Sequence, residues 1–210
     1  MRLLRPASED EVVAVFLRAE ADDTGRYRAP ILERLRHDRQ PLDTVRRPDL
    51  NDPRLNAYRR RLLGELRGFG RGDGMFVGFP PRVEWHRAAL PRDELLEVRY
   101  IDDRGSDDYW VTLSGGSRRP RDAAARIREG IGPQWAIGVW ESSGCEAVVR
   151  RLKQGSLPEL IVATTPRPGR VVVVEGNGRL TSFALFPEQL PDVVEVYCAI
   201  AEGLESWGLY

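Results

Sequence analysis

The chain of 210 residues, 41% of them hydrophobic, is long enough to bury one substantial core, and we expect one domain over residues 1–210. Its 32 basic and 32 acidic residues balance, so the overall charge argues against a membrane or nucleic acid as a partner. Nucleic acid could bind only through a local basic patch. No apolar run approaches the roughly 20 residues of a membrane span, and the N-terminus lacks the apolar stretch of a signal peptide. Because Cys145 and Cys198 show neither a disulfide pattern nor metal-ligand spacing, we expect a cytoplasmic protein with no metal site of its own.

The first part of the chain carries three helical patterns. Ser8 followed by Glu11 is a capping box, and the apolar residues after it recur on one face. A second helix is predicted around residues 31–35, and Asp52, which is followed by proline, is a typical start for a third, longer helix. We therefore expect residues 1–85 to form a mostly helical N-terminal portion.

Two features of this portion bear on function. The third helix carries Arg59, Arg60 and Arg61, and such a triplet either meets phosphates or forms a solvated face. Residues 68–78 contain five glycines interleaved with aromatic residues, without the strand and helix that a dinucleotide-binding fingerprint requires. We predict a mobile loop there, of the kind that serves as a lid.

Residues 86–210 are predicted to form an α/β core, which makes the chain a mixed α+β protein. A short helix is expected over 91–100, and the aromatic and β-branched sequence of residues 109–113 predicts a strand. A helix from about 120 to 129 follows. The turn between that strand and helix consists of Ser114, Gly115, Gly116, Ser117 and Arg118. Free backbone N–H groups at such a place can hold an anion, and a plain turn is an equally good interpretation.

The remaining elements follow in quick succession. A helix is expected over 144–153, and two strands over 160–163 and 170–174 are joined by a Pro/Gly turn into a hairpin. The second of these strands contains four consecutive valines, which indicates burial on both faces. A last apolar strand is expected over 193–200.

Directly after the valine strand comes a corner that combines three features of phosphate sites. Its residues are Glu175, Gly176, Asn177, Gly178, Arg179, Leu180 and Thr181. The start of a helix offers unpaired N–H donors, glycine lets an anion approach the backbone, and an arginine adds a planar fork suited to phosphate oxygens. We predict a phosphate-binding corner at Glu175 to Arg179.

The order of parts around this corner resembles the ParB/sulfiredoxin superfamily. An apolar strand, a turn, a second apolar strand, an acidic residue and Gly-x-x-Arg before a helix are shared with that fold, and Gly176 and Arg179 match its two fixed positions. Members include CTP-hydrolysing partition proteins, an ADP-dependent serine kinase and sulfiredoxin. The resemblance implies that a nucleotide such as ATP, ADP or CTP, with or without Mg²⁺, lies with its phosphates at this turn.

Two positions depart from that pattern. Asn177 stands where sulfiredoxin has its catalytic cysteine, so the resemblance does not imply sulfinic-acid reduction. Gly178 stands where several members have a histidine or arginine, which implies one phosphate ligand fewer. Glu175 matches the acidic residue of many members, and Thr181 lies near the first turn of the helix.

Three functional hypotheses follow. In the first, the protein is a phosphotransferase or nucleoside triphosphatase: residues 176–179 and Thr181 hold phosphates, 114–118 hold a second anionic group, and Glu175 orients a nucleophile on an unknown small-molecule acceptor or helps to hold Mg²⁺. In the second, it is a regulator of the ParB-like class, linked to DNA or binding a small molecule without turnover. In the third, the glycine only permits a positive φ angle, and Arg179 pairs with a carboxylate at the edge of the core.

Overall fold

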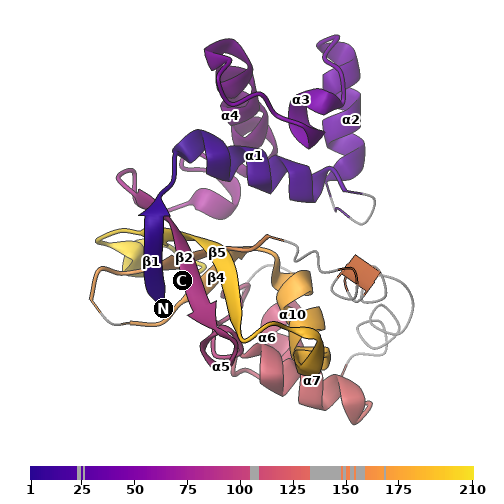
Figure 1. The fold of residues 1–210 in the computed structure, drawn as a ribbon, viewed down its shortest axis with the longest axis vertical. Coiled ribbons are helices and arrows are strands. Elements are labelled where there is room, and N and C mark those ends of the chain that lie inside the picture. Colours follow the sequence, from indigo (N-terminus) through magenta and orange to yellow (C-terminus); the bar gives the residue numbers. More distant parts are fainter. Residues whose placement is uncertain are drawn as a thin grey trace.

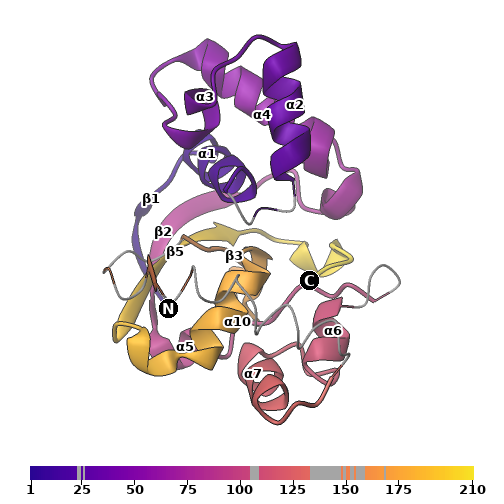
Figure 2. The ribbon, with the colours of Figure 1, turned by 90° about the vertical axis from the view of Figure 1, so that its right-hand side faces the viewer.

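The computed structural model describes residues 1–22, 25, 27–104, 109–132, 148, 150, 151, 154, 159–167 and 169–210. A five-stranded mixed sheet lies between two groups of helices, one from the N-terminal part of the chain and one from the C-terminal part (Figures 1 and 2). The predicted mixed α+β class is confirmed.

The sheet has the strand order β1-β2-β5-β3-β4. Its strands are β1 (Arg2–Pro6), β2 (Glu84–Pro91), β3 (Ile161–Thr164), β4 (Val172–Glu175) and β5 (Val193–Ile200). Neighbouring strands are antiparallel except β3 and β5, which are parallel. The predicted hairpin is confirmed as β3 and β4, in which Ile161 faces Glu175, and β5 is confirmed as the last strand.

The N-terminal helical layer covers one face of this sheet. It contains α1 (Glu9–Glu20), α2 (Arg28–His37), α3 (Asp43–Arg46), α4 (Pro53–Arg67) and the 3₁₀ turn η1 (Gly74–Phe76). The capping box of Ser8 and Glu11 begins α1, and the side chain of Asp52 caps α4 by accepting hydrogen bonds from two backbone N–H groups, so both predicted helix starts are confirmed.

The opposite face carries the second group of helices. It contains α5 (Arg92–Leu95), α6 (Tyr109–Leu113), α7 (Pro120–Arg128) and α10 (Asn177–Leu185), and the 3₁₀ turns η2 (Pro187–Gln189) and η3 (Leu204–Ser206) complete the chain. Helix α10 packs against α7, and the guanidinium of Arg128 donates to the carbonyl oxygens of Ala184 and Leu185 at the C-terminal end of α10. That end of α10 is therefore capped by a cation.

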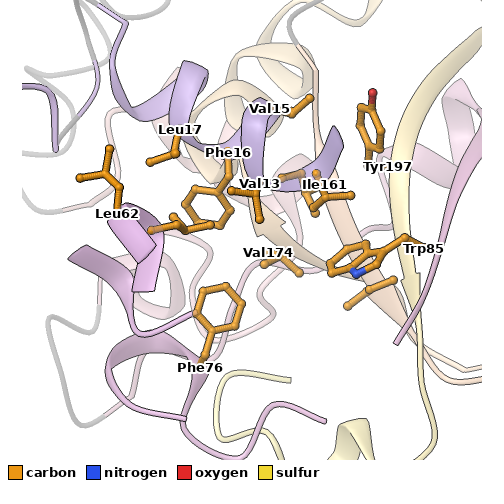
Figure 3. Packing of buried hydrophobic residues seen from close by; sticks show 14 of the residues in the cluster. Val13, Val15, Phe16, Leu17, Leu62, Phe76, Trp85, Ile161, Val174 and Tyr197 are labelled. Carbon is orange, nitrogen blue, oxygen red and sulfur yellow. The ribbon is translucent and has the colours of Figure 1, made fainter. Parts of the chain in front are cut away.

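Two apolar cores, one on each face of the sheet, join the layers. In the first, Phe16 and Leu17 of α1 pack with Leu62 of α4 above Ile161 and Val174 of the sheet (Figure 3). In the second, Leu180 and Phe183 of α10 pack against residues of β3 and β5. All three valines of β4 are buried, as predicted for a strand covered on both faces.

Several predicted elements were wrong. Residues 109–113 form helix α6 rather than a strand, and the helix expected over 91–100 shrinks to α5. The strands β1 and β2 were not predicted, and β1 joins the N-terminal portion directly to the sheet. The helix expected over 144–153 lies outside the continuously described residues.

Part of the glycine-rich segment 68–78 packs onto the core, and its role as a mobile lid stays a prediction. Its Phe76 is 3% exposed and packs edge-to-face against Phe79, which in turn meets Trp207. The indole nitrogen of Trp207 donates to the carbonyl oxygen of Met75. In the part of the chain that the structure describes, no helix has both the length and the apolar character to cross a bilayer.

Candidate functional site

The predicted corner is the junction of β4 with α10, and Gly176 makes its shape possible. Gly176 caps α10 with a left-handed φ of 108°, a conformation that residues with a side chain rarely adopt. A Cβ atom there would lie 2.4 Å from Cδ2 of Leu160 and 3.1 Å from the guanidinium of Arg179. The turn therefore needs glycine for its backbone angle and for the close approach of its neighbours.

The first turn of α10 keeps its backbone donors open. The hydrogen bonds of the helix begin with the N–H of Leu180, which donates to the carbonyl oxygen of Gly176. Among the described residues, no acceptor faces the N–H groups of Asn177, Gly178 and Arg179, and Gly176 has no side chain to cap them. These three residues are half-buried rather than enclosed. The positive end of the helix dipole therefore faces a partly open surface.

The arginine of the corner turns back over the glycine. Nη2 of Arg179 donates to Oε1 of Glu175 at 2.6 Å, and both side chains are about five-sixths buried, with 17% and 16% exposed. Burial raises the pKa of Glu175, and the charges of Arg179 and Arg67 oppose that rise. The pairing agrees with the third hypothesis, in which Arg179 meets a carboxylate at the edge of the core.

A second ion pair lies in the N-terminal helical layer. Glu20, the last residue of α1, is 7% exposed, and its Oε1 lies 3.6 Å from Nε of Arg67 at the end of α4. Its Oε2 accepts one long hydrogen bond of 3.4 Å from the backbone N–H of Tyr27. Burial, and then repulsion by Glu175, raise the pKa of Glu20 to about 7, against the attraction of Arg67.

These four residues, Glu20, Arg67, Glu175 and Arg179, form what we call the corner cluster. The first pair joins α1 to α4 and the second joins β4 to α10, and the first apolar core packs α1 and α4 onto the sheet (Figures 1 and 3). The sequence predicted Glu175 and Arg179 as site residues and did not predict Glu20 or Arg67. A glutamate at the end of an amphipathic helix is normally exposed, so only its position beside buried Phe16 and Leu17 gave a hint.

Thr181 lies inside the molecule rather than at the mouth of the corner. It is completely buried, its hydroxyl donates to the carbonyl oxygen of Asn177, and it shares a 2.6 Å hydrogen bond with the hydroxyl of Tyr100. The Oδ1 atom of Asn177 accepts from the N–H of Ile101 at 3.4 Å. Thr181 therefore fixes α10 against Tyr100. Its hydroxyl is buried and already hydrogen-bonded, so it is not available to a phosphate.

The second predicted anion site, at residues 114–118, has no open donors. It follows helix α6, not a strand, so its N–H groups close the end of that helix: those of Gly115 and Gly116 donate to carbonyl oxygens of α6. The N–H of Arg118 donates to Oγ of Ser114, and the N–H of Ser117 to the carbonyl oxygen of Ser114. The plain-turn interpretation fits this geometry.

Arg118 is a structural residue at the end of this turn. Its side chain is 5% exposed, and its guanidinium lies 3.1 Å from Oδ2 of Asp102 and donates to the backbone oxygen of Tyr210. A hydrogen bond from Arg104, and then the charge of Arg118, hold the pKa of Asp102 below its ordinary value. Arg118 thus joins two distant segments.

The arginine triplet of α4 does not form a free basic patch. Arg59 is completely buried and donates to the carbonyl oxygens of Thr44 and Asp49. Arg60 pairs with Asp10, and Arg61 lies within 3.3 Å of Asp38. Arg59 is therefore an interior residue, and neither predicted role, phosphate contact or a solvated face, describes it.

Two surface hollows lie over α4, and none of the four corner-cluster residues lines either of them. The smaller, of about 380 Å³, is lined by Arg60, Gly64, Phe69 and neighbouring residues, and the larger, of about 680 Å³, by Asp52 and Tyr58 among others. No group of three or more His, Cys, Asp or Glu side chains converges among the described residues.

Comparison with known proteins adds no identification. No protein-family model matches the chain, and no curated protein or solved structure matches it.

Proposed function

We propose that the protein binds a nucleotide, with ATP, ADP and CTP as candidates, by placing its phosphates at the start of α10. The open N–H groups of Asn177, Gly178 and Arg179, next to a guanidinium, carry this proposal. Three convergent donors and a helix dipole favour an anion at this place. The ParB/sulfiredoxin-like arrangement of the corner is part of the same proposal.

Arg179 is suited to a phosphate because its pairing with Glu175 uses only one of its nitrogen atoms. Nη2 contacts Glu175, and neither Nε nor Nη1 hydrogen-bonds to any residue that the structure describes. A guanidinium can therefore keep its hydrogen bond to the carboxylate and present its other edge to phosphate oxygens. Glu175 acts here as a positioning residue that holds Arg179 over Gly176.

Phosphoryl transfer or nucleotide hydrolysis is the activity that we propose for this site. Such reactions depend mainly on positioning and on charge that stabilises phosphate oxygens, and both follow from the donors of α10. Mg²⁺ bound to the nucleotide would need only one or two protein carboxylates, and Glu175 is the nearest to the open N–H groups along the chain. Ser114 to Arg118 have no part in the proposal, because their donors are already used.

The test is a calorimetric titration of the purified protein with ATP, ADP, CTP and GTP, with and without Mg²⁺. We expect one nucleotide to bind saturably and Arg179→Ala to weaken it by about 10- to 100-fold, as charge-assisted hydrogen bonds contribute roughly 1.5–3 kcal/mol. Arg179→Lys should recover part of the affinity, since it keeps the charge and loses the planar fork.

Arg121→Ala is the matched control, because Arg121 is half-exposed on α7 and pairs with Glu97 away from the corner. It should leave the affinity unchanged. Failure of every nucleotide to bind to folded wild-type protein would sink the proposal. Binding without any turnover would instead favour a non-catalytic regulator of the ParB-like class.

A further inference from the structure

We propose that a groove along α4 binds single-stranded nucleic acid, with arginines contacting its phosphates and two aromatic side chains contacting its bases. The groove belongs to the N-terminal helical layer (Figure 1), and no residue of α10 or of the corner cluster lines it. The inference therefore goes beyond the proposed nucleotide site and does not depend on it.

The two hollows over α4 adjoin each other, because Arg61 lines both of them. The larger hollow follows the N-terminal half of α4 and reaches Gln40, which lies beyond the end of α2. The smaller follows the C-terminal half of α4 and reaches residues 69–71. A helix of 15 residues is about 22 Å long. Together the hollows form what we call the α4 groove, an elongated surface that suits a chain-like ligand.

The charge of this part of the chain differs from that of the whole. Residues 27–71 contain 12 arginines and six acidic residues, an excess of six positive charges in a chain whose formal net charge is zero. Such a local excess attracts a polyanion even where the protein as a whole is neutral. The charged residues that line the α4 groove are Arg54, Arg60, Arg61, Arg71, Glu9, Asp52 and Glu65.

Three of these arginines have N–H donors left for phosphate oxygens. The guanidinium of Arg54 is exposed and forms no hydrogen bond or ion pair with any residue that the structure describes. Arg71 is 54% exposed, and its ion pair with Asp73 is long, at 4.0 Å. Arg61 is 56% exposed, and its Nη2 lies 3.3 Å from Asp38. An arginine that is exposed and loosely paired can turn its planar fork to a phosphate.

Two of the three carboxylates of the α4 groove are already neutralised by partners. Asp52 accepts hydrogen bonds from the backbone N–H groups of Arg54 and Leu55, as the cap of α4. Oε2 of Glu65 lies 2.9 Å from Nη2 of Arg34. These two carboxylates therefore repel a phosphate less than free ones would.

One half-buried aromatic side chain lines each hollow, Tyr58 in the larger and Phe69 in the smaller. The ring of Phe69 stands nearly perpendicular to that of Phe76, with 5.1 Å between the centroids, which fixes it at the edge of the core. The guanidinium of Arg61 lies 5.1 Å from the centroid of Tyr58. Aromatic rings set among cations are typical of surfaces that bind single strands, whose bases are free to stack on them.

Gly64 shapes the smaller hollow. It is buried in the interior of α4, where glycine weakens a helix. A Cβ atom at Gly64 would lie 3.0 Å from the carbonyl oxygen of Phe69 and 3.1 Å from Cδ of Arg71. Its absence lets the glycine-rich segment lie against α4. The aromatic ring and the loosely paired guanidinium thus meet at one end of the α4 groove.

An anionic membrane would also be attracted by this charge, but the apolar side chains that it requires are scarce here. Helices that lie on a membrane insert large apolar residues along one face. Among residues 27–71, Leu50 is the one large apolar residue that is exposed, at 39%. The composition of this surface therefore favours nucleic acid.

The experiment measures fluorescence anisotropy of a labelled oligothymidylate of about 20 nucleotides, at about 50 and 200 mM salt. It compares the wild type with the double variant Arg54→Ala/Arg71→Ala and with Arg121→Ala. Arg121, on α7, is 51% exposed and serves as the matched control. Unlabelled single strand, a duplex of the same length and vesicles of phosphatidylglycerol are the competitors. Thermal unfolding verifies that each protein is folded.

We expect the affinity of the wild type to fall about 10- to 20-fold between the two salt concentrations, as for roughly three phosphate contacts. The double variant should bind about 10-fold more weakly at low salt, and its affinity should fall only about threefold between the two concentrations. Arg121→Ala should behave like the wild type. Phe69→Leu should weaken binding and leave the salt dependence unchanged, because stacking on a base does not involve charge.

Several outcomes overturn the inference, and all of them leave the proposed nucleotide site at α10 untouched. One is that folded wild-type protein does not bind the oligothymidylate at low salt. Another is that the double variant and Arg121→Ala lose equal affinity, which would place binding outside the α4 groove. Competition by the duplex as strong as that by the single strand would remove the role of the aromatic residues. Stronger competition by the vesicles would identify a membrane-binding surface instead.

Discussion

Two glycine-containing turns of this protein, at Gly176 and at Gly115 and Gly116, look alike in sequence and differ in what their backbones offer. The first leads from a strand into α10 and leaves three N–H groups without an acceptor among the residues that the structure describes. The second ends helix α6, whose carbonyl oxygens take the N–H groups of both glycines. A glycine turn before a helix can bind an anion only when the element before it does not use the same donors.

The two regions also differ in how their charges are balanced. Asp102, beside the second turn, has a lowered pKa because Arg104 and Arg118 both stabilise its charge. Glu20 and Glu175 have raised pKa values, because burial outweighs the charges of the arginines paired with them. A carboxylate whose charge is stabilised by its partners is typical of a structural contact. A carboxylate whose pKa is strongly raised is more common at functional sites. The predictions below test this difference.

The largest effect on stability is expected from Arg118→Ala. It would leave Asp102 and the backbone oxygen of Tyr210 without their buried partner, and it should lower the free energy of unfolding by about 3–5 kcal/mol. Denaturant unfolding measures this loss. Arg119→Ala is the control, because its ion pair with Glu97 is exposed and should contribute less than about 1 kcal/mol. Similar losses for the two variants would refute the structural role of Arg118.

The pH dependence of stability tests the corner cluster. The pKa of Glu20 rises from its ordinary value of 4.5 to about 7 in the folded protein, so the folded state binds more protons than the unfolded state between these values. The free energy of unfolding should therefore fall as the pH rises from about 4.5 to 7, by on the order of 3 kcal/mol.

Glu20→Gln should remove most of that slope, and Glu33→Gln, at an exposed position of α2, should retain it. Denaturant titrations at intervals between pH 4 and 8 give the slope for each protein. A wild-type stability that stays level or rises across this range would show that Arg67 compensates for the burial of Glu20.

Alanine at the two turns separates backbone strain from close packing. Gly116 has a φ of 90° with nothing within 4 Å of an added Cβ, whereas a Cβ at Gly176, with a φ of 108°, would meet Leu160. Gly116→Ala should lower the free energy of unfolding by about 1–2 kcal/mol from the backbone angle alone. Gly176→Ala should lower it by about 1–3 kcal/mol more, because of the clash. Equal losses would mean that Leu160 moves aside readily.

The smallest effect is expected from Ser114→Ala. Its Oγ accepts from the N–H of Arg118 at 2.9 Å, and losing this hydrogen bond should lower the free energy of unfolding by about 1 kcal/mol. Nucleotide affinity, measured by calorimetry, should not change. A marked loss of nucleotide affinity would show that residues 114–118 belong to the binding site. The difference between the two turns would then be wrong.

The sequence by itself determined the features that depend on short-range geometry. The caps at Ser8 and Asp52, the hairpin of β3 and β4, and the glycine before Arg179 are set within a few residues. Capping boxes, turn residues and a positive φ angle act locally, so their patterns can be recognised without knowing the rest of the fold. The position of the phosphate-binding corner was predicted in this way and stays a prediction.

The tertiary structure alone decided which segments became strands and which charges were buried. Residues 109–113 have a strand-like composition but form α6, because Asp103 accepts hydrogen bonds from the N–H groups of Trp110 and Val111 at its start. The segment of β2, in which polar and apolar residues are mixed, is a strand because β1 and β5 pair with its two edges. Strand preference depends on such neighbours more than on composition.

The corner cluster shows the same limit for function. Glu20 and Glu175 are 155 positions apart in the sequence, and neither has a pattern that points to the other. Burial and the charge of Glu175 both raise the pKa of Glu20, and the burial comes from the packing of α1 and α4 onto the sheet. Local chemistry therefore predicted a phosphate-binding corner, and long-range packing decided that Glu20 is buried beside Arg67.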